Sequence, residues 1–487
     1  MEVHCQQAQP RPYRPRRPTQ TVLYQVVQGH LETVLAAPED GTSAIPAHAE
    51  RALRRYLECG ILAHGFARAR CGDCGHDFLI AFSCKGRGVC PSCNTRRMAE
   101  TAAHLVDHVL PPVALRQWVL SLPRRLRWHL HHQPGALDTA LRVLLDAIER
   151  ELRTRCDTAA TNARGGAVAF IHRFGSALNA HTHFHVCAID GVFEPHGEGV
   201  CFRPAPAPSP EDIETVQAAV RRRILHAFQR RGWLERGDRL EMEQWRHGGG
   251  FSLDASVGIA GADRRGRERL LRYCARPPFA GERLEWIDAE RVRYRLPRPR
   301  PDGRTELILS PPQLIERVAA LVPPPRRHRL RYYGVLAPNA ALRPAVTALA
   351  LEQDAEASAL GPAGLNGALS TAADEIDPAP RDNRRKARYL WAILLARIYE
   401  AFPLTCPQCA GEMRIIAFVT DPASIQAILA HIGEPTRAPT PAPARDPPAW
   451  ASAIDGAETM AHQVEPAGTD PLAQPEPESV FDQRIAW

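Results

Sequence analysis

The stretch LNAHTHFHVCAIDG, residues 178–191, constrains the fold more than any other part of this chain. His181, His183 and His185 stand at every second position, and an apolar run and an Asp-Gly pair follow them. Since a β-strand alternates its faces with a period of two, the three imidazoles should point to the same side of a sheet. Imidazole is the commonest metal ligand in proteins and also acts as an acid or base. The pattern predicts a buried strand that carries a metal site, a proton-transfer group or structural histidines.

The remaining patterns predict an α+β domain with an antiparallel sheet in which the histidine strand is central. Further strands are expected over 117–123, 166–175 and 251–260, and a hairpin over 291–310 that turns at Pro301-Asp302-Gly303. Helices are expected within 21–58, over 209–233 with Ser209 as the cap, and from Asp263 to Pro277-Pro278. Strands and helices that do not alternate strictly favour this class over a parallel α/β fold.

The chain has 13 cysteines, and their spacing favours metal binding over a disulfide framework. Two C-x-x-C pairs, Cys71 with Cys74 and Cys90 with Cys93, are separated by fifteen residues, as in tetrahedral zinc sites. We therefore expect these four thiolates to share one structural Zn²⁺.

Further cysteines leave alternatives open. Cys59 and Cys84 are either replacement ligands, ligands of a second ion or small buried residues. Cys406 and Cys409 form another C-x-x-C pair that no second pair follows, so they are either a metal site or inert.

Basic residues lie between the two C-x-x-C pairs and just after the second one. Lys85, Arg87, Arg96 and Arg97 are expected either to contact DNA or to belong to a purely structural zinc ribbon.

The net charge of +7 lies entirely before Gly433, because nine acidic residues and only three arginines follow that position. Almost all positive charge is arginine, which binds phosphate bidentately and stacks on bases. A GC-rich coding sequence is the alternative cause of the arginine bias. The sign of the charge nevertheless indicates a nucleic-acid partner. No apolar run of about 18 residues and no secretory signal occurs, so no membrane contact and a cytoplasmic protein are expected.

Composition divides the chain into six segments. These are a basic Pro/Arg arm (1–20), a zinc-binding DNA-binding module (21–108), a domain of mixed helices and strands (109–350), a linker (351–382), a C-terminal helix with its C-x-x-C pair (383–432) and a disordered acidic tail (433–487).

Tyr273 lies on the helix that begins at Asp263. Helical spacing places Arg269 and Arg276 on the same face as this phenol, and Arg272 lies beside it. Two interpretations are open. Either the guanidiniums hold a phosphodiester for attack by the phenol, or Tyr273 packs in an amphipathic helix whose arginines are solvated.

Three stretches, FSCKGRGVCPSC, FGSALNAHTHFHVCAIDGVF and DRRGRERLLRYCARPPFAGERL, resemble rolling-circle transposases of the HUH endonuclease class. The resemblance is to the insertion-sequence ninety-one family and its single-tyrosine, common-region branch, and it spans about residues 20–430. It implies an HUH endonuclease domain flanked by helices. It also implies that His183 and His185 bind a catalytic Mg²⁺ or Mn²⁺ and that Tyr273 is the nucleophile. His172 and His181 are the two candidates for a third ligand.

The resemblance further implies nicking and rejoining of single-stranded DNA at the ends of a mobile element through a 5′-phosphotyrosine. It implies host replication proteins as partners and a possible homo-oligomer. It also implies a location at the bacterial nucleoid. Two-tyrosine members carry a second tyrosine where this chain has Arg269.

The alternatives are a rolling-circle replication initiator or relaxase, a metal-dependent hydrolase and a non-catalytic zinc-dependent DNA-binding protein. Tyr294, Tyr332 and Tyr333 are the next candidate nucleophiles.

Overall fold

The computed structural model describes most of the chain up to residue 359 and a shorter C-terminal part. The described residues are 16–36, 45–156, 161–197, 199–300, 302–359, 406, 408–409, 411 and 413–445. Most of the predicted basic arm, most of the linker and the predicted helix over 383–402 lie outside them. No helix among the described residues is long and apolar enough to span a bilayer.

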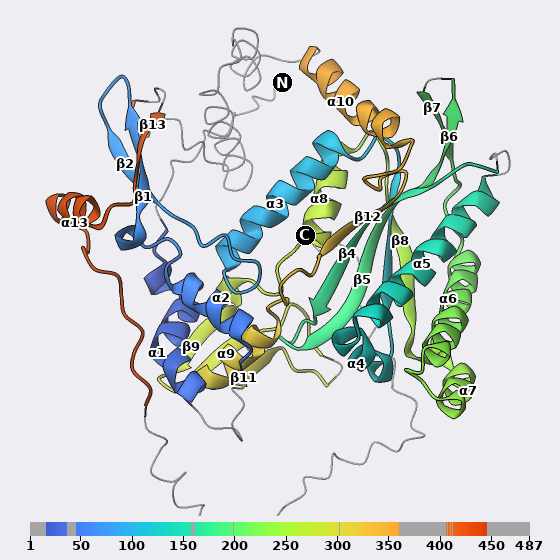
Figure 1. Cartoon of the computed structure of the whole chain (residues 1–487), viewed down its shortest axis with the longest axis horizontal. Helices are drawn as coiled ribbons and strands as arrows, with labels where there is room; N and C mark the ends of the chain where they lie inside the picture. The colour runs from blue at the N-terminus through green and yellow to red at the C-terminus, as the bar shows by residue number, and fades with distance from the viewer. Residues whose placement is uncertain are drawn as a thin grey trace, which may run out of the picture.

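A five-stranded antiparallel sheet forms the centre of the molecule, as the sequence predicted (Figure 1). In order across the sheet, the strands are β12 (Leu330–Gly334), β4 (Gly166–Phe174), β5 (Ala180–Ile189), β3 (Leu115–Ser121) and β8 (Ser252–Ile259). The histidine strand β5 is the middle strand, and four of the five strands were predicted. The edge strand β12 was not predicted.

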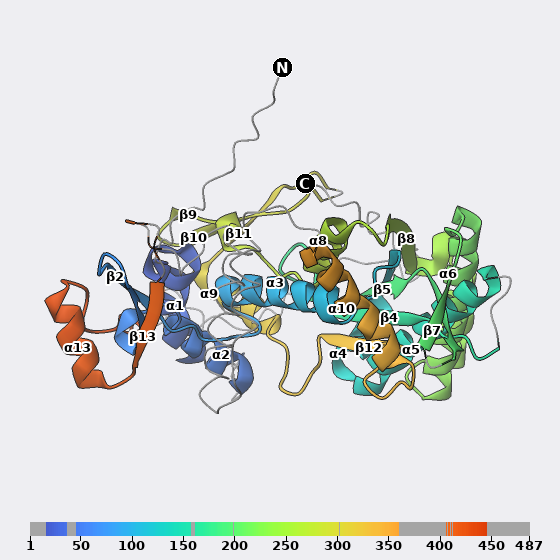
Figure 2. The same cartoon turned by 90° about the horizontal axis from the view of Figure 1, so that it is seen from above.

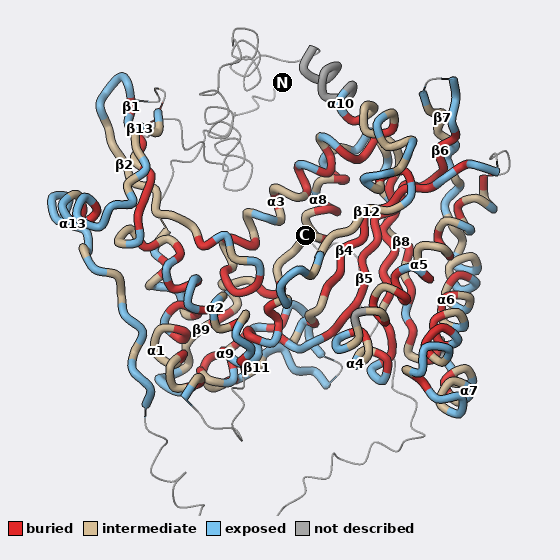
Figure 3. Tube along the Cα trace, in the orientation of Figure 1, coloured by how far each residue is buried: buried red, intermediate tan, exposed pale blue. Residues whose placement is uncertain are grey.

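Helices cover both faces of this sheet, so the fold class is α+β. One face packs on α4 (Arg124–His132), α5 (Pro134–Arg155), α6 (Pro210–Arg230) and α7 (Arg236–Gln244). The other packs on α3 (Pro91–His108), α8 (Arg264–Cys274) and α10 (Arg343–Ala359). Strand alternation sends Phe184 and Val186 into the first core and Cys187 and Ile189 into the second. Figure 3 shows β4 and β5 buried along most of their length.

The predicted helix caps are present. Ser209 accepts a hydrogen bond from the Asp212 amide in a capping box that begins α6. Asp263 accepts from the Gly266 amide and begins α8. The apolar face of α8, Leu270 and Leu271, is buried against the sheet. The Asp263 cap fixes where α8 starts and therefore which of its side chains face β5.

A second lobe lies beside the sheet domain and has its own core. Helices α1 (Val22–Ala36), α2 (Ala47–Leu57) and α9 (Pro311–Ala320) pack there on the antiparallel sheet of β9 (Leu284–Asp288), β10 (Arg291–Arg295) and β11 (Glu306–Leu309). Pairing of β10 with β11 confirms the predicted hairpin. Segments from both ends of the described chain therefore share one core.

A small sheet projects from this lobe at one end of the molecule (Figure 2). It consists of β2 (Asp77–Ala81), β1 (Phe66–Cys71) and β13 (Met413–Val419), and helix α13 (Pro422–His431) packs against it. A hairpin of β6 (Gly191–His196) and β7 (Gly199–Pro204) extends from the opposite end.

The start of the predicted acidic tail is ordered rather than disordered. Residues 433–445 run along α1, where the Ala442 amide donates to the Gln28 carbonyl over 2.8 Å and the Arg445 amide donates to Thr33. Ala438 also packs against the core of the second lobe, so these contacts hold a part of the segment for which disorder was predicted.

Candidate active site and cysteine clusters

Three histidines converge on the face of the sheet that α3 and α8 cover. His172 comes from β4, and His183 and His185 come from β5; one ring nitrogen of each lies within 4.8 Å of the others. The register pairs His172 directly with His183, so the strands themselves bring the rings together. All three side chains are buried. The structure thus adds His172 to the predicted pair.

His181 is not part of this group. It lies on the same strand, but its Nε2 is 3.0 Å from the Ser121 hydroxyl, and the three-histidine group does not include it. Of the two candidate third ligands, the geometry favours His172.

Neighbouring groups orient each imidazole. His172 Nε2 lies 2.6 Å from the Cys274 carbonyl, so this nitrogen donates a proton and Nδ1 carries the lone pair. His183 Nδ1 lies 3.1 Å from the His181 carbonyl, which leaves Nε2 for a ligand. Gln117 Nε2 lies 2.8 Å from His185 Nδ1. With the amide flipped, Gln117 Oε1 would accept the Nδ1 proton, and the lone pair of His185 Nε2 would be available to a ligand.

The donor set fits a divalent metal. Burial, followed by the neighbouring imidazoles and Arg276, lowers the pKa values of His183 and His185 well below the usual range; His172 is lowered by burial and by Arg276. The rings are therefore neutral, as metal ligation requires. His172 Nδ1 and His185 Nε2 are buried and make no hydrogen bond, and such atoms need a partner.

Tyr273 lies next to the histidines on α8. Its ring centroid is 5.7 Å from that of His185, and the Arg276 guanidinium lies 4.2 Å over the phenol ring. Cys274, the next residue, contacts both Gln117 and Cys187 through its thiol. These contacts place the phenol on the histidines' side of the sheet.

The alternative tyrosines lie elsewhere. Tyr294 is buried in the second lobe, Tyr333 packs into the opposite core and Tyr332 packs near Arg343.

The arginines predicted to bind DNA differ in their surroundings. Arg272 pairs with Glu268 and Arg96 pairs with Glu100, whereas Arg269 and Lys85 are exposed. Arg87 and Arg97 lie near Arg329, whose pKa falls to about 10 through burial and then through these two arginines and Arg173. No ion pair found among the described residues involves Arg87, Arg173 or Arg329.

Sequence reasoning missed Gln117, Cys274, Arg173 and Arg329. Gln117 faces the histidines because it is paired with Cys187 across β3 and β5.

The predicted zinc set of Cys71, Cys74, Cys90 and Cys93 is wrong. The structure separates the two C-x-x-C pairs into two clusters, one of Cys59, Cys84, Cys90 and Cys93, the other of Cys71, Cys74, Cys406 and Cys409. Cys71 and Cys74 end β1 in the projecting sheet, whereas Cys90 precedes α3, so the fold holds them apart. The structure thus brings the two single cysteines, Cys59 and Cys84, together with Cys90 and Cys93.

The first cluster has the surroundings of a thiolate site. Sulfur–sulfur distances from Cys59 to Cys90 and to Cys93 are both 3.6 Å. The Cys84 amide donates to Cys59 Sγ, and the Arg16 guanidinium lies 3.7 Å from the same sulfur. Hydrogen bonds from the neighbouring thiols lower the pKa of Cys59. These donors offset the negative charge that four thiolates bring to a Zn²⁺ ion.

Comparison with known proteins agrees with this arrangement. Residues 166–342 match the family described as "Putative transposase", and residues 26–122 match the family described as "Transposase zinc-binding domain". The chain is 23% identical over 310 residues to the transposase for insertion sequence element IS801 of Pseudomonas savastanoi pv. phaseolicola; the alignment covers 58% of this chain and 69% of that protein. No solved structure matches.

These matches make the chain similar to transposases and, near its N-terminus, to their zinc-binding domain, and they support a transposase of the insertion-sequence ninety-one (IS91) family.

Proposed function

We propose that this transposase is a metal-dependent HUH-type endonuclease and strand transferase. It cuts and rejoins single-stranded DNA at the ends of a mobile element through a 5′-phosphotyrosine. The observation that carries the proposal is the position of Tyr273 beside His185, at the edge of three converging imidazoles.

His172, His183 and His185 would hold the catalytic ion. When bound, a divalent cation supplies Lewis-acid polarisation of the scissile phosphate and stabilises the leaving oxygen. An all-imidazole set suits Mn²⁺ better than Mg²⁺, which prefers oxygen ligands. Cleavage is therefore expected to be faster with Mn²⁺ at equal concentration.

Tyr273 is the proposed nucleophile. Its phenolic oxygen forms a bond to phosphorus, the bond from phosphorus to the 3′-oxygen breaks, the phenolic proton passes to solvent and the 3′-oxygen gains a proton. One phosphodiester is thus exchanged for another, and a 3′-hydroxyl can later attack the phosphotyrosine and regenerate Tyr273 without an external energy source. The free 3′-end is suited to extension by host replication proteins.

Arg276 is the proposed phosphate-binding residue. Its guanidinium lies 4.2 Å over the Tyr273 ring, so it would stay close to a phosphate that the phenol attacks. A guanidinium stabilises the extra negative charge of the transition state.

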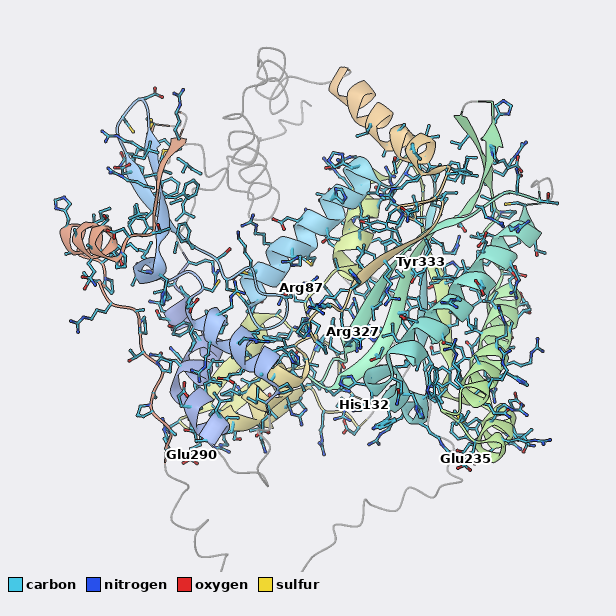
Figure 4. The ribbon with its side chains drawn as sticks, in the orientation of Figure 1. Arg87, His132, Glu235, Glu290, Arg327 and Tyr333 are labelled. Carbon is cyan, nitrogen blue, oxygen red and sulfur yellow. The ribbon has the colours of Figure 1, made fainter. Side chains whose placement is uncertain are left out.

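A cluster of like charges marks the proposed path of the strand. After burial, the charges of Arg87 and Arg97, from the segment around the first cysteine cluster, and of Arg173, from β4, lower the pKa of Arg329, which precedes β12. Figure 4 labels Arg87 and Arg327, which lie toward the middle of the molecule, and Arg327 also acts on Arg173. Phosphates of a single strand would neutralise these guanidiniums. Arg173 neighbours His172 along β4, but strand alternation sends the two side chains to opposite faces of the sheet, so the proposed path would reach the histidines around the strand ends.

The single tyrosine on α8 has a consequence for the reaction cycle. Arg269 occupies the position four residues before Tyr273, so both strand transfers would either reuse Tyr273 or employ a second subunit. In this proposal residues 109–350 form the endonuclease domain. A location at the bacterial nucleoid in the cytoplasm fits the same function. A structural Zn²⁺ in the cluster of Cys59, Cys84, Cys90 and Cys93 would hold the N-terminus of α3 and the nearby arginines.

The test is a nicking assay on single-stranded DNA from the element's ends with Mn²⁺ present. Wild-type protein should form a covalent adduct that survives denaturation, and Tyr273→Phe should form none while its DNA affinity is unchanged. Tyr332→Phe is the matched control and should form the adduct. An adduct with Tyr273→Phe would refute the assignment of the nucleophile.

A further inference from the structure

The second cysteine cluster lies outside both the histidine site and the first cysteine cluster. Cys71 and Cys74 follow β1, and Cys406 and Cys409 precede β13, yet all four sulfurs lie within 4.8 Å of one another. Two of the cysteines, Cys406 and Cys409, lie beyond both family matches. Antiparallel pairing of Cys71 with Met413 and Phe66 with Val419 brings the two segments together.

Sulfur–sulfur distances exclude disulfides and fit a shared ion. Cys71 Sγ is 3.4 Å from Cys409 Sγ, and Cys74 Sγ is 3.5 Å from Cys406 Sγ. A disulfide bond is about 2.05 Å long, whereas two thiolates on one tetrahedral Zn²⁺, each at 2.3 Å, lie about 3.8 Å apart.

The backbone around the sulfurs is folded into two tight turns. The Gln408 amide donates to Cys406 Sγ and the Gly411 amide donates to Cys409 Sγ, both over 3.4 Å. The Cys71 amide donates to the His76 carbonyl and the Cys406 amide to the Gly411 carbonyl, both over 2.8 Å. Each C-x-x-C pair thus turns back on itself, and Gly75 supplies the positive φ that the first turn needs. Amide donors to sulfur stabilise the thiolate form.

The projecting sheet has too little core to hold this arrangement alone. Among the described residues, its buried apolar cluster at the cysteine end is Ala69 and Met413 with two of the cysteines, and the one at the other end is Phe66, Ile425 and Leu429; the remaining apolar side chains packed on these clusters are partly buried. Small units with so little buried apolar surface usually need a metal or a disulfide to be stable. The four thiols occupy the place where such a link would act.

We propose that Cys71, Cys74, Cys406 and Cys409 bind a second structural zinc ion. The site joins the N-terminal module to a segment more than 330 residues later in the chain. Four protein thiolates leave no open coordination position, so the ion has a structural role. Soft thiolate ligands select zinc over the hard cation expected at the histidines.

The experiment is elemental analysis of full-length protein after dialysis against a weak chelator. Wild type should contain two zinc ions per chain. Cys406→Ser/Cys409→Ser should contain one, because only the second cluster loses ligands. Cys156→Ser/Cys201→Ser, which changes two cysteines outside both clusters, is the matched control and should retain two. A single zinc in wild type, or two in the Cys406→Ser/Cys409→Ser variant, would overturn the proposal.

A second measurement does not depend on the variant folding. Replacing zinc by Co²⁺ in wild type should give thiolate-to-cobalt absorption at 2:1 metal to protein that is twice the absorption at 1:1. Saturation at 1:1, or a Cys71–Cys409 disulfide in peptides from unreduced protein, would contradict two thiolate sites. Neither readout requires nicking activity, so failure of the proposed function would leave this test intact.

Discussion

His172 Nε2 and the carbonyl oxygen of Cys274 are 2.6 Å apart, and this hydrogen bond joins the histidine cluster to the helix that carries Tyr273. Cys274 is the last residue of α8, where a backbone carbonyl has no partner within the helix. The same imidazole can therefore hold a metal through Nδ1 and hold the tyrosine's helix through Nε2. This dual role leads to the first prediction.

His172→Ala should impair both roles, whereas His172→Gln should impair mainly metal binding. The alanine variant leaves the Cys274 carbonyl buried without its donor, which should lower the free energy of unfolding by about 1–3 kcal/mol. A glutamine amide can still donate to that carbonyl. Denaturant titration of the metal-free proteins and Mn²⁺ titration of cleavage measure the two effects separately. Equal loss of stability in both variants would argue against the helix-holding role.

Gln117→Leu should weaken metal binding although Gln117 is not a ligand. The change removes the side chain that contacts His185 Nδ1 and, with its amide flipped, would accept the Nδ1 proton. Loss of such a partner typically costs about 10–100-fold in metal affinity. Gln117→Glu keeps an acceptor and should stay close to wild type. Mn²⁺ affinity from calorimetry is the measurement; an unchanged affinity in Gln117→Leu would remove Gln117 from the positioning of His185.

Arg329→Gln should weaken binding of single-stranded DNA and reduce its salt dependence. Loss of one phosphate contact lowers the slope of log K against log salt by about 0.7. Arg291→Gln is the control, because Arg291 is exposed and already paired with Asp288. Fluorescence anisotropy over a range of salt concentrations measures both slopes. If the two variants behave alike, the DNA does not contact Arg329.

The metal-free protein should lose stability as the pH falls below about 6.5. Burial lowers the pKa values of His172, His183 and His185 in the folded state. Below their ordinary pKa the unfolded chain binds protons that the folded chain does not. The free energy of unfolding therefore falls by up to about 1.4 kcal/mol per pH unit for each group, and the full stability is present above that pH.

The pH effect is measured by urea unfolding of chelator-treated protein at pH about 7.5 and about 5.5. His172→Gln should show a shallower loss, and His132→Gln, at an exposed histidine, should match wild type. An equally steep loss in His172→Gln would mean that His172 is not kept neutral by burial.

Much of the fold was predictable because its signals are local. Alternation identified β5, and the caps Ser209 and Asp263 identified α6 and α8. Strand β12 was missed because it is a short edge strand that follows a run of prolines and arginines. Its place is set by pairing with β4, which no local pattern records.

The cysteine grouping could not be predicted from spacing. Any two C-x-x-C pairs can complete a tetrahedral site, and the nearer pairs in sequence are not the nearer pairs in space. The number of cysteines was a usable signal. The three C-x-x-C pairs together with the single residues Cys59 and Cys84 make two complete sets of four cysteines. In the same way, Gln117 and Arg329 reach the candidate site only through strand pairing, so composition gave no indication of them.

Strand β1 lies between β2 and β13, and this order has a consequence for synthesis of the protein. Cys71 leaves the ribosome 338 residues before Cys409. Through most of translation, β1 therefore presents an unpaired edge and two thiols to the cytoplasm, while the central domain folds between them. A gene copy truncated near its 3′ end would encode a chain that keeps the histidines and Tyr273 but never closes this sheet. Damaged copies of the element would then yield aggregation-prone protein rather than a smaller active transposase.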